Sequence, residues 1–236
     1  MLPLALIVKD SPRDEVRAAG KEPVDPSSGP GSTAPRAELR AGSSLVEAMK
    51  TRSFWLMCSA HFICGNGCGF IMTHIVIFAT DMGYSEMVAA TLLSVQGGVN
   101  LLGVLFTGYL SDRIVRNRAL ALTHFVRSLS FATVVIFIML GGGPLWVLYA
   151  AMALFGFGWF TTAPLQAGLV ADLFGGRSMG TIIGAITASH ILGMALGAYA
   201  GGAIFEATRS YYLFFVIQSL LEFLAAAFAF SVKKGK

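Results

Sequence analysis

Six long and almost uncharged apolar segments follow one another after residue 52. They cover residues 53–79, 87–110, 119–140, 145–171, 180–204 and 210–232. A helix needs about 20 predominantly apolar residues to cross a bilayer, and all six segments reach that length. Residues 53–236 contain only six acidic and nine basic residues, too few to solvate the surface of a soluble domain. The sequence therefore predicts an all-α membrane protein whose residues 53–236 form a bundle of six transmembrane helices.

The first 52 residues differ in composition from the rest of the chain. Residues 9–52 contain five of the eight prolines together with mixed charge, so they cannot bury enough apolar area to offset the entropy of ordering them. We expect a cytoplasmic loop there, preceded at residues 2–8 by the end of a helix whose beginning is absent. Ser44 and Glu47 have the spacing of a capping box and predict a brief helix on the membrane surface before the first span.

The distribution of basic residues predicts the orientation. Fifteen of the 17 lysines and arginines fall in residues 1–52, in the loop 111–118, at Arg177 or at the carboxyl end, all of which face one side of a six-span bundle. The other side has only Arg209. Because basic residues collect in cytoplasmic loops, both termini are predicted to lie in the cytoplasm, with the chain in the cell (inner) membrane. Dispersed in this way, the positive charge forms no patch that would bind nucleic acid.

Polar side chains at membrane depth are the candidates for a substrate pathway, because each is costly there unless it faces protein or water. The candidates on the six spans are His190, Asn66, Gln96, Asn100, Trp159, His61 and His74. Any of them could instead be a buried polar group of the bundle, and His124, near a cytoplasmic end, is expected to be interfacial.

Arg127 and Glu222 are two charged residues within the predicted spans. Each lies eight to ten residues from the cytoplasmic end of its helix, which corresponds to about 12–15 Å at the helical rise. Opposite charge at similar depth predicts an intramembrane pair, whereas the alternative is that Arg127 extends independently to the interface.

No motif for catalysis or for a cofactor stands out. Cys64 and Cys68 share a helix face, but free cysteines in apolar segments usually behave as small hydrophobes, so no metal site is expected. Residues 176–180 match G-x-S-x-G, yet they lie between two membrane helices rather than at a strand-to-helix turn. The glycines of residues 65–69 lack the context of a dinucleotide site. We therefore expect neither an enzyme, nor a catalytic residue, nor a cofactor.

Two segments resemble a known transporter family. GYLSDRIVRNR, residues 108–118, is similar to the cytoplasmic-loop signature of the major facilitator superfamily, although Val115 stands where a glycine is common. Residues 171–211 and the TRSFW of residues 51–55 resemble monocarboxylate-transporter-like and oxalate–formate-antiporter-like members. The likeness covers helices seven to twelve of a twelve-helix fold, together with the loop before them.

The resemblance implies a secondary transporter that moves a small organic solute by alternating access. Residues 53–140 and 145–232 would be two inverted three-helix repeats. The resemblance makes five of the pathway candidates lining residues of the cavity: His190, Asn66, Gln96, Asn100 and Trp159. A cytoplasmic gate would contain Gly108, Asp112, Arg113 and Arg116. The expected partners are the lipid bilayer, the solute, protons in some mechanisms, and an amino-terminal six-helix half or a second copy.

Departures from the family pattern bear on the solute. Oxalate–formate antiporters carry an arginine and a lysine where this chain has Val104 and His190, so a fixed cationic site is missing. A titratable imidazole at His190 could still bind a monocarboxylate or related organic anion, or couple transport to protons. The alternative is a non-transporting membrane subunit or a truncated, inactive half-transporter.

Overall fold

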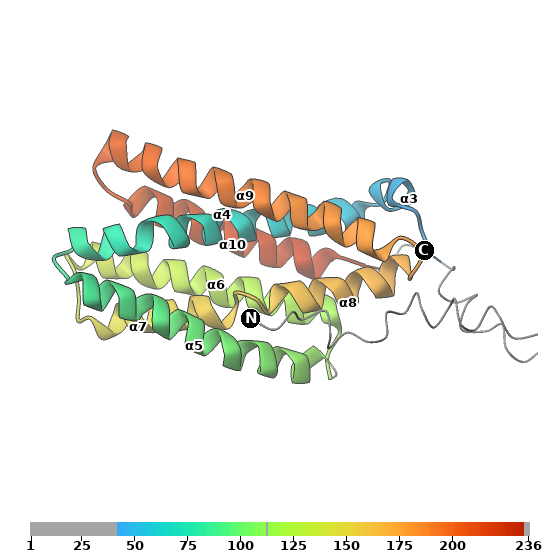
Figure 1. Cartoon of the computed structure of the whole chain (residues 1–236), viewed down its shortest axis with the longest axis horizontal. Helices are drawn as coiled ribbons and strands as arrows, with labels where there is room; N and C mark the ends of the chain where they lie inside the picture. The colour runs from blue at the N-terminus through green and yellow to red at the C-terminus, as the bar shows by residue number, and fades with distance from the viewer. Residues whose placement is uncertain (1–41, 112, 234–236) are drawn as a thin grey trace, which may run out of the picture. The chain divides into compact units, whose positions relative to one another are not determined.

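The computed structural model describes residues 42–111 and 113–233, and within them the fold is all-α. Its helices are α3 (Leu45–Met49), α4 (Arg52–Asp81), α5 (Glu86–Ser111), α6 (Arg116–Met139), α7 (Trp146–Phe157), α8 (Thr162–Phe174), α9 (Met179–Thr208) and α10 (Tyr212–Ser231) (Figure 1). With α7 and α8 taken as one segment, six of these are long and apolar enough to cross a membrane. The predicted all-α architecture with six membrane-spanning helices is therefore confirmed for the described residues.

Local sequence signals explain where several helices begin and end. The side chain of Thr51 accepts a hydrogen bond from the Phe54 amide and starts α4 at Arg52. Arg209 adopts a left-handed conformation (φ 54°) and ends α9 at Thr208, four residues beyond the predicted end of that span. A short polar turn follows, so that α10 begins at Tyr212 rather than at residue 210.

The short helix α3 is built on a capping box. The Ser44 side chain accepts from the Glu47 amide at 3.3 Å, and the Glu47 carboxylate accepts from the Ser44 amide at 2.7 Å. These hydrogen bonds lower the pKa of the Glu47 carboxyl below its usual value. Just before α3, the Ser43 amide donates to the carbonyl of Phe174, which ties the start of α3 to the end of α8.

The fourth span is broken in the middle. α7 ends at Phe157, α8 begins at Thr162, and Pro164 lies in the first turn of α8, where its missing amide hydrogen removes no helical hydrogen bond. The Thr162 hydroxyl donates to the carbonyl of Trp159 at 3.1 Å, so it satisfies one backbone acceptor at the break. The interruption therefore begins several residues before the proline and displaces Trp159 from a regular helix.

The two three-helix segments, α4 to α6 and α7 to α10 with α7 and α8 as one helix, make corresponding helix contacts. The first helix of each segment packs against the second helix of the other, so α4 packs along α9 and α7 packs against α5. The third helix of each segment packs on the first helix of the other, so α10 packs on α4 and α6 packs on α7 and α8. The two third helices, α6 and α10, pack on each other. Figure 1 shows α4 and α9 side by side along their length. Because each segment has three helices, the second enters the bundle in the opposite direction to the first, which is the arrangement of an inverted repeat.

Glycines permit the closest of these approaches. A side chain at Gly197 of α9 would collide with the backbone carbonyl of Asn66 in α4, and one at Gly156 of α7 would collide with that of Gln96 in α5. Small residues at an interface let helix backbones come together in this way. The same device therefore joins α4 to α9 and α7 to α5, and it places Gln96 beside the broken span.

Candidate solute pocket and buried polar network

A cavity of about 330 Å³ lies between α5 and the break of the fourth span. It is lined by Met72, Leu93, Gln96, Gly97, Asn100, Trp159 and Phe160. Its volume falls in the range of small-molecule sites, and its walls are mostly apolar with a few polar groups, as in such sites generally. Three of the sequence-predicted pathway residues, Gln96, Asn100 and Trp159, are brought together here.

Gln96 is the polar feature of this cavity. Its side chain is only 1% exposed, and neither its amide nitrogen nor its oxygen has a hydrogen-bond partner among the described residues. A buried polar group without a partner costs about 1–3 kcal/mol, and such groups are rare in native proteins. A donor and an acceptor of this cavity-lining residue therefore lack partners among the described residues.

The break of the fourth span supplies an aromatic wall. The rings of Trp159 and Phe160 are nearly parallel, with an interplanar angle of 3° and centroids 5.5 Å apart. Asn100 donates from Nδ2 to the carbonyl of Gly156 at 3.1 Å, so its amide is committed to the end of α7. The sequence analysis did not identify Phe160 or Met72, because an aromatic or aliphatic residue in a membrane span carries no signal that separates a pocket wall from a lipid contact.

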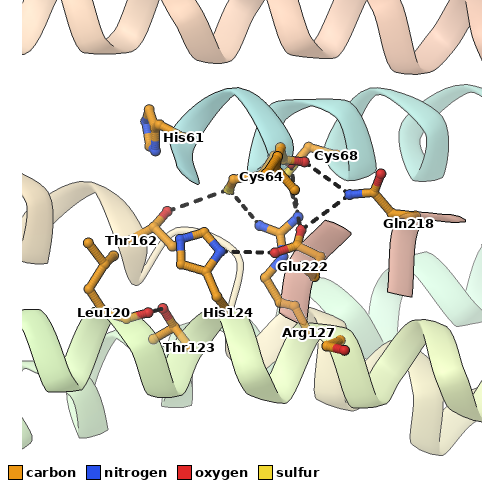
Figure 2. A network of polar contacts seen from close by, with 12 residues as sticks. His61, Cys64, Cys68, Leu120, Thr123, His124, Arg127, Thr162, Gln218 and Glu222 are labelled. Atoms are coloured by element: carbon orange, nitrogen blue, oxygen red, sulfur yellow. Dashed lines mark hydrogen bonds and ion pairs between the residues drawn. The ribbon is translucent and has the colours of Figure 1, made fainter. Parts of the chain in front are cut away.

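A second polar assembly is buried at the centre of the bundle (Figure 2). Arg127 of α6 and Glu222 of α10 are both fully buried, and Arg127 Nη2 lies 2.9 Å from Glu222 Oε1. His124 Nδ1 lies 2.9 Å from Glu222 Oε2. Gln218 Nε2 donates to the carbonyl of Ile63 at 3.0 Å and lies 3.4 Å from the Glu222 carboxylate. The structure thus brings Arg127 and Glu222 together and adds partners to the carboxylate.

Arg127 also connects α6 to α4. Its Nη1 donates to Cys64 Sγ at 2.7 Å, its Nη2 donates to the Cys64 carbonyl at 2.9 Å, and its guanidinium carbon lies 4.8 Å from the centre of the Phe155 ring. The interfacial position expected for His124 is wrong, because this side chain is 1% exposed and contacts Glu222. The network pairs two buried charges and connects α4, α6 and α10, although Arg127 Nε and Gln218 Oε1 have no partner among the described residues. None of its members lines the 330 Å³ cavity.

The remaining pathway candidates lie outside that cavity. The rings of His61 in α4 and His190 in α9 are 4.6 Å apart, centre to centre. His74 Nε2 lies 2.8 Å from the Ala198 carbonyl, and its Nδ1 lies 3.3 Å from the Tyr211 hydroxyl. Asn66 is buried at the contact of α4 with α9. Three of the seven candidates therefore line the cavity, and the other four lie along the contact of α4 with α9.

The residues expected to form a gate also separate. Gly108 lines a cavity of about 270 Å³ with Thr107, Ser111, Pro164 and Leu165, between α5 and α8. The Arg113 guanidinium lies 4.5 Å from the centre of the Tyr109 ring. Arg116, at the start of α6, forms an ion pair with Asp172 near the end of α8. Asp112 lies outside the described residues.

Comparison with known proteins provides a further observation. A family profile described as "Major Facilitator Superfamily" matches residues 1–198 of the chain. The chain is 29% identical over 154 residues to a protein of Bacillus subtilis (strain 168) named "Uncharacterized MFS-type transporter YcxA". That match covers 64% of this chain but 37% of the relative, so the chain spans well under two thirds of the relative's length.

Proposed function

Because the chain belongs to the major facilitator superfamily, we propose that it forms one half of a secondary transporter that moves a small organic solute across a membrane by alternating access. It is a multi-pass membrane protein. α5 and α9 are the least buried of the six spans. Their apolar faces fit an amino-terminal six-helix half or a second copy of the chain.

The observation that carries the proposal is Gln96. Its unpaired amide, in a largely apolar cavity of about 330 Å³, supports a solute that combines an apolar body with a hydrogen-bonding group. The ring of Trp159 offers a flat surface for that body. Binding would satisfy the Gln96 amide, which favours occupancy over an empty pocket.

The finer proposal is a monocarboxylate or related organic anion. The described residues that line the cavity include neutral amides and no cationic side chain. An anion that enters with a proton meets this condition, because the combination is neutral and needs no fixed counter-charge in a medium of low dielectric constant. Proton-coupled transport of a monocarboxylate is therefore the form of the proposal that fits the pocket best.

The cytoplasmic gate and the orientation belong to the same proposal. We place Gly108, Asp112, Arg113 and Arg116 at the cytoplasmic end of the path, with both termini in the cytoplasm and the chain in the cell membrane. The ion pair of Arg116 with Asp172 joins the start of α6 to α8 and gives this end a contact that rocking of the helices could release.

Uptake of labelled solutes into sealed vesicles tests the proposal. Vesicles contain the chain alone or the chain with a matching amino-terminal half, and they are offered a panel of monocarboxylates and neutral analogues at two pH gradients. We expect uptake with both halves, driven by an inward proton gradient. Gln96→Leu should lower apparent affinity about 5- to 10-fold, the loss of one or two neutral hydrogen bonds.

Ser94→Ala provides the matched control. Ser94 lies two residues earlier on α5, its hydroxyl donates to the Ala90 carbonyl at 3.1 Å, and it does not line the cavity. Uptake should be unchanged in this variant. Absence of uptake for every solute, alone and with the second half, would sink the transporter proposal and favour a non-transporting subunit or an inactive half. If Gln96→Leu and Ser94→Ala changed uptake equally, the cavity would not be the solute site.

A further inference from the structure

Three potential metal-ligating side chains meet at the contact of α4 with α9. His61 and Cys64 lie one helical turn apart on α4, His190 lies opposite on α9, and the ligand atoms of the three residues are all within 4.8 Å of one another. His61 and Cys64 are buried, and His190 is half-buried. The backbones can approach this closely because Gly65 faces the His190 carbonyl, with which a side chain there would collide.

Neighbouring groups orient two of the three ligands, His190 and Cys64. His190 Nδ1 lies 3.2 Å from the His61 carbonyl, and donating its proton there leaves Nε2 with the lone pair that a metal ion accepts. Metal-binding histidines are commonly oriented by such a hydrogen bond. Cys64 Sγ accepts a hydrogen bond from the Arg127 guanidinium at 2.7 Å, and this contact would stabilise the thiolate that forms when a metal replaces the thiol proton.

The charge of the surroundings limits the ion. Arg127 and Glu222 neutralise each other. Arg127 donates to two thiol sulfurs, Cys64 Sγ at 2.7 Å and Cys68 Sγ at 3.5 Å, and only Cys64 belongs to the cluster, so the thiolate formed at Cys64 brings one negative charge to the ion. In a low-dielectric interior it balances a monovalent cation, whereas a divalent ion would leave an uncompensated charge. Thiolate and imidazole ligands suit soft ions such as Cu⁺. We propose that His61, Cys64 and His190 bind one Cu⁺ ion.

The geometry allows this ion with small movements. With bonds of roughly 2.0 Å to nitrogen and 2.3 Å to sulfur, the ligand atoms of a three-coordinate ion are separated by about 3.5–3.7 Å. Contraction by about 1 Å from the present limit of 4.8 Å is within reach of side-chain rotation. His61 also lines a cavity of about 50 Å³ with Gln166 and Thr187, which is large enough for a water molecule beside the site. On binding, the Cys64 thiol releases its proton to solvent.

Anaerobic competition for Cu⁺ tests the site in the purified full-length chain in detergent. The chain is titrated against a colorimetric Cu⁺ chelator, and Ag⁺ serves as a probe that does not change oxidation state. We expect one Cu⁺ per chain, with an X-ray absorption spectrum showing one sulfur and two nitrogen ligands. Cys64→Ala should weaken binding at least about 100-fold, and His61→Ala or His190→Ala about 10- to 100-fold or more, since loss of even an outer-shell partner costs that much.

Cys58→Ala is the matched control, because Cys58 is another buried free cysteine of α4 and does not belong to the cluster. Its affinity should equal that of the unmodified chain. The absorption spectrum needs no variant, so a variant that fails to fold leaves the proposal testable. The proposal is overturned if Cu⁺ and Ag⁺ do not bind, if Zn²⁺ binds more tightly than Cu⁺, or if the sulfur ligand persists in Cys64→Ala. These outcomes are independent of solute uptake.

Discussion

Removing the negative charge of Glu222 should destabilise the bundle strongly. In Glu222→Gln the fully buried Arg127 guanidinium would keep four favourable contacts among the described residues: Cys64 Sγ, the Cys64 carbonyl, Cys68 Sγ and the face of Phe155. The new amide adds no charge to compensate it. Breaking a buried ion pair by removing one partner typically costs about 3–5 kcal/mol, because the remaining charge is uncompensated. We expect Glu222→Gln to fall in that range.

The reverse change should cost less. In Arg127→Met the carboxylate of Glu222 keeps His124, 2.9 Å away, and Gln218, 3.4 Å away. The carboxylate therefore retains two hydrogen-bonding partners, so we expect a loss smaller by about 1 kcal/mol or more than that of Glu222→Gln. A double variant, Arg127→Met with Glu222→Leu, leaves neither charge and should recover most of the stability.

The free energy of unfolding should be measured by titration of the folded chain in mixed micelles with sodium dodecyl sulfate, followed by tryptophan fluorescence. The two single variants and the double variant form a cycle whose interaction energy isolates the pair. A cost below about 1 kcal/mol for Glu222→Gln would contradict the reasoning, as would a double variant that loses the sum of the single losses.

Three further predictions concern packing, the surface and pH. Gly197→Val should lower the free energy of unfolding by about 1–3 kcal/mol or more in the same titration, because a side chain there collides with α4. Gly184→Val should lower it little, because a side chain there meets open space. Equal losses in the two variants would contradict this prediction. Arg116→Gln, which breaks the half-exposed pair with Asp172, should change stability by less than about 1 kcal/mol, and a larger loss would show a structural role. The capping hydrogen bonds lower the pKa of Glu47, so the ionised carboxylate should stabilise α3 fully above its ordinary pKa of 4.5, and this stabilisation should be lost as the pH falls through the lowered pKa. Amide hydrogen exchange of α3, corrected for the intrinsic rate, should therefore quicken over that range. A constant corrected rate would refute the prediction.

The number of membrane-spanning helices and their order could be predicted from the sequence, because the bilayer sets the length and apolar character of each span. Apolar length predicts each span, and charge scarcity excludes a soluble domain, without knowledge of any contact. The break before Pro164 was harder to locate, since proline signals an interruption but the unwound residues, Gly158 to Thr161, precede it. Their position depends on how α7 packs against α5 through Gly156.

The candidate site was only partly predictable. Polarity alone marked Gln96, Asn100 and Trp159, and it marked His61, His74 and His190 equally well, although these lie elsewhere. Which polar groups share a cavity depends on helix rotation and on the glycine contacts between spans. The pairing of Arg127 with Glu222 followed from equal depth, whereas the contact of His124 with the same carboxylate required the angular position of α6 and was not foreseen.

The claim that the α5 cavity belongs to a path open to each side in turn can be tested by thiol accessibility. Leu93, which lines the cavity, is replaced by cysteine in the chain, and the variant is placed in sealed vesicles together with the proposed amino-terminal half. A membrane-impermeant thiol reagent is then applied from one face or the other. Alternating access predicts modification from both faces, and protection from both by a transported solute. Modification from one face only, or indifference to every solute that is taken up, would contradict the account.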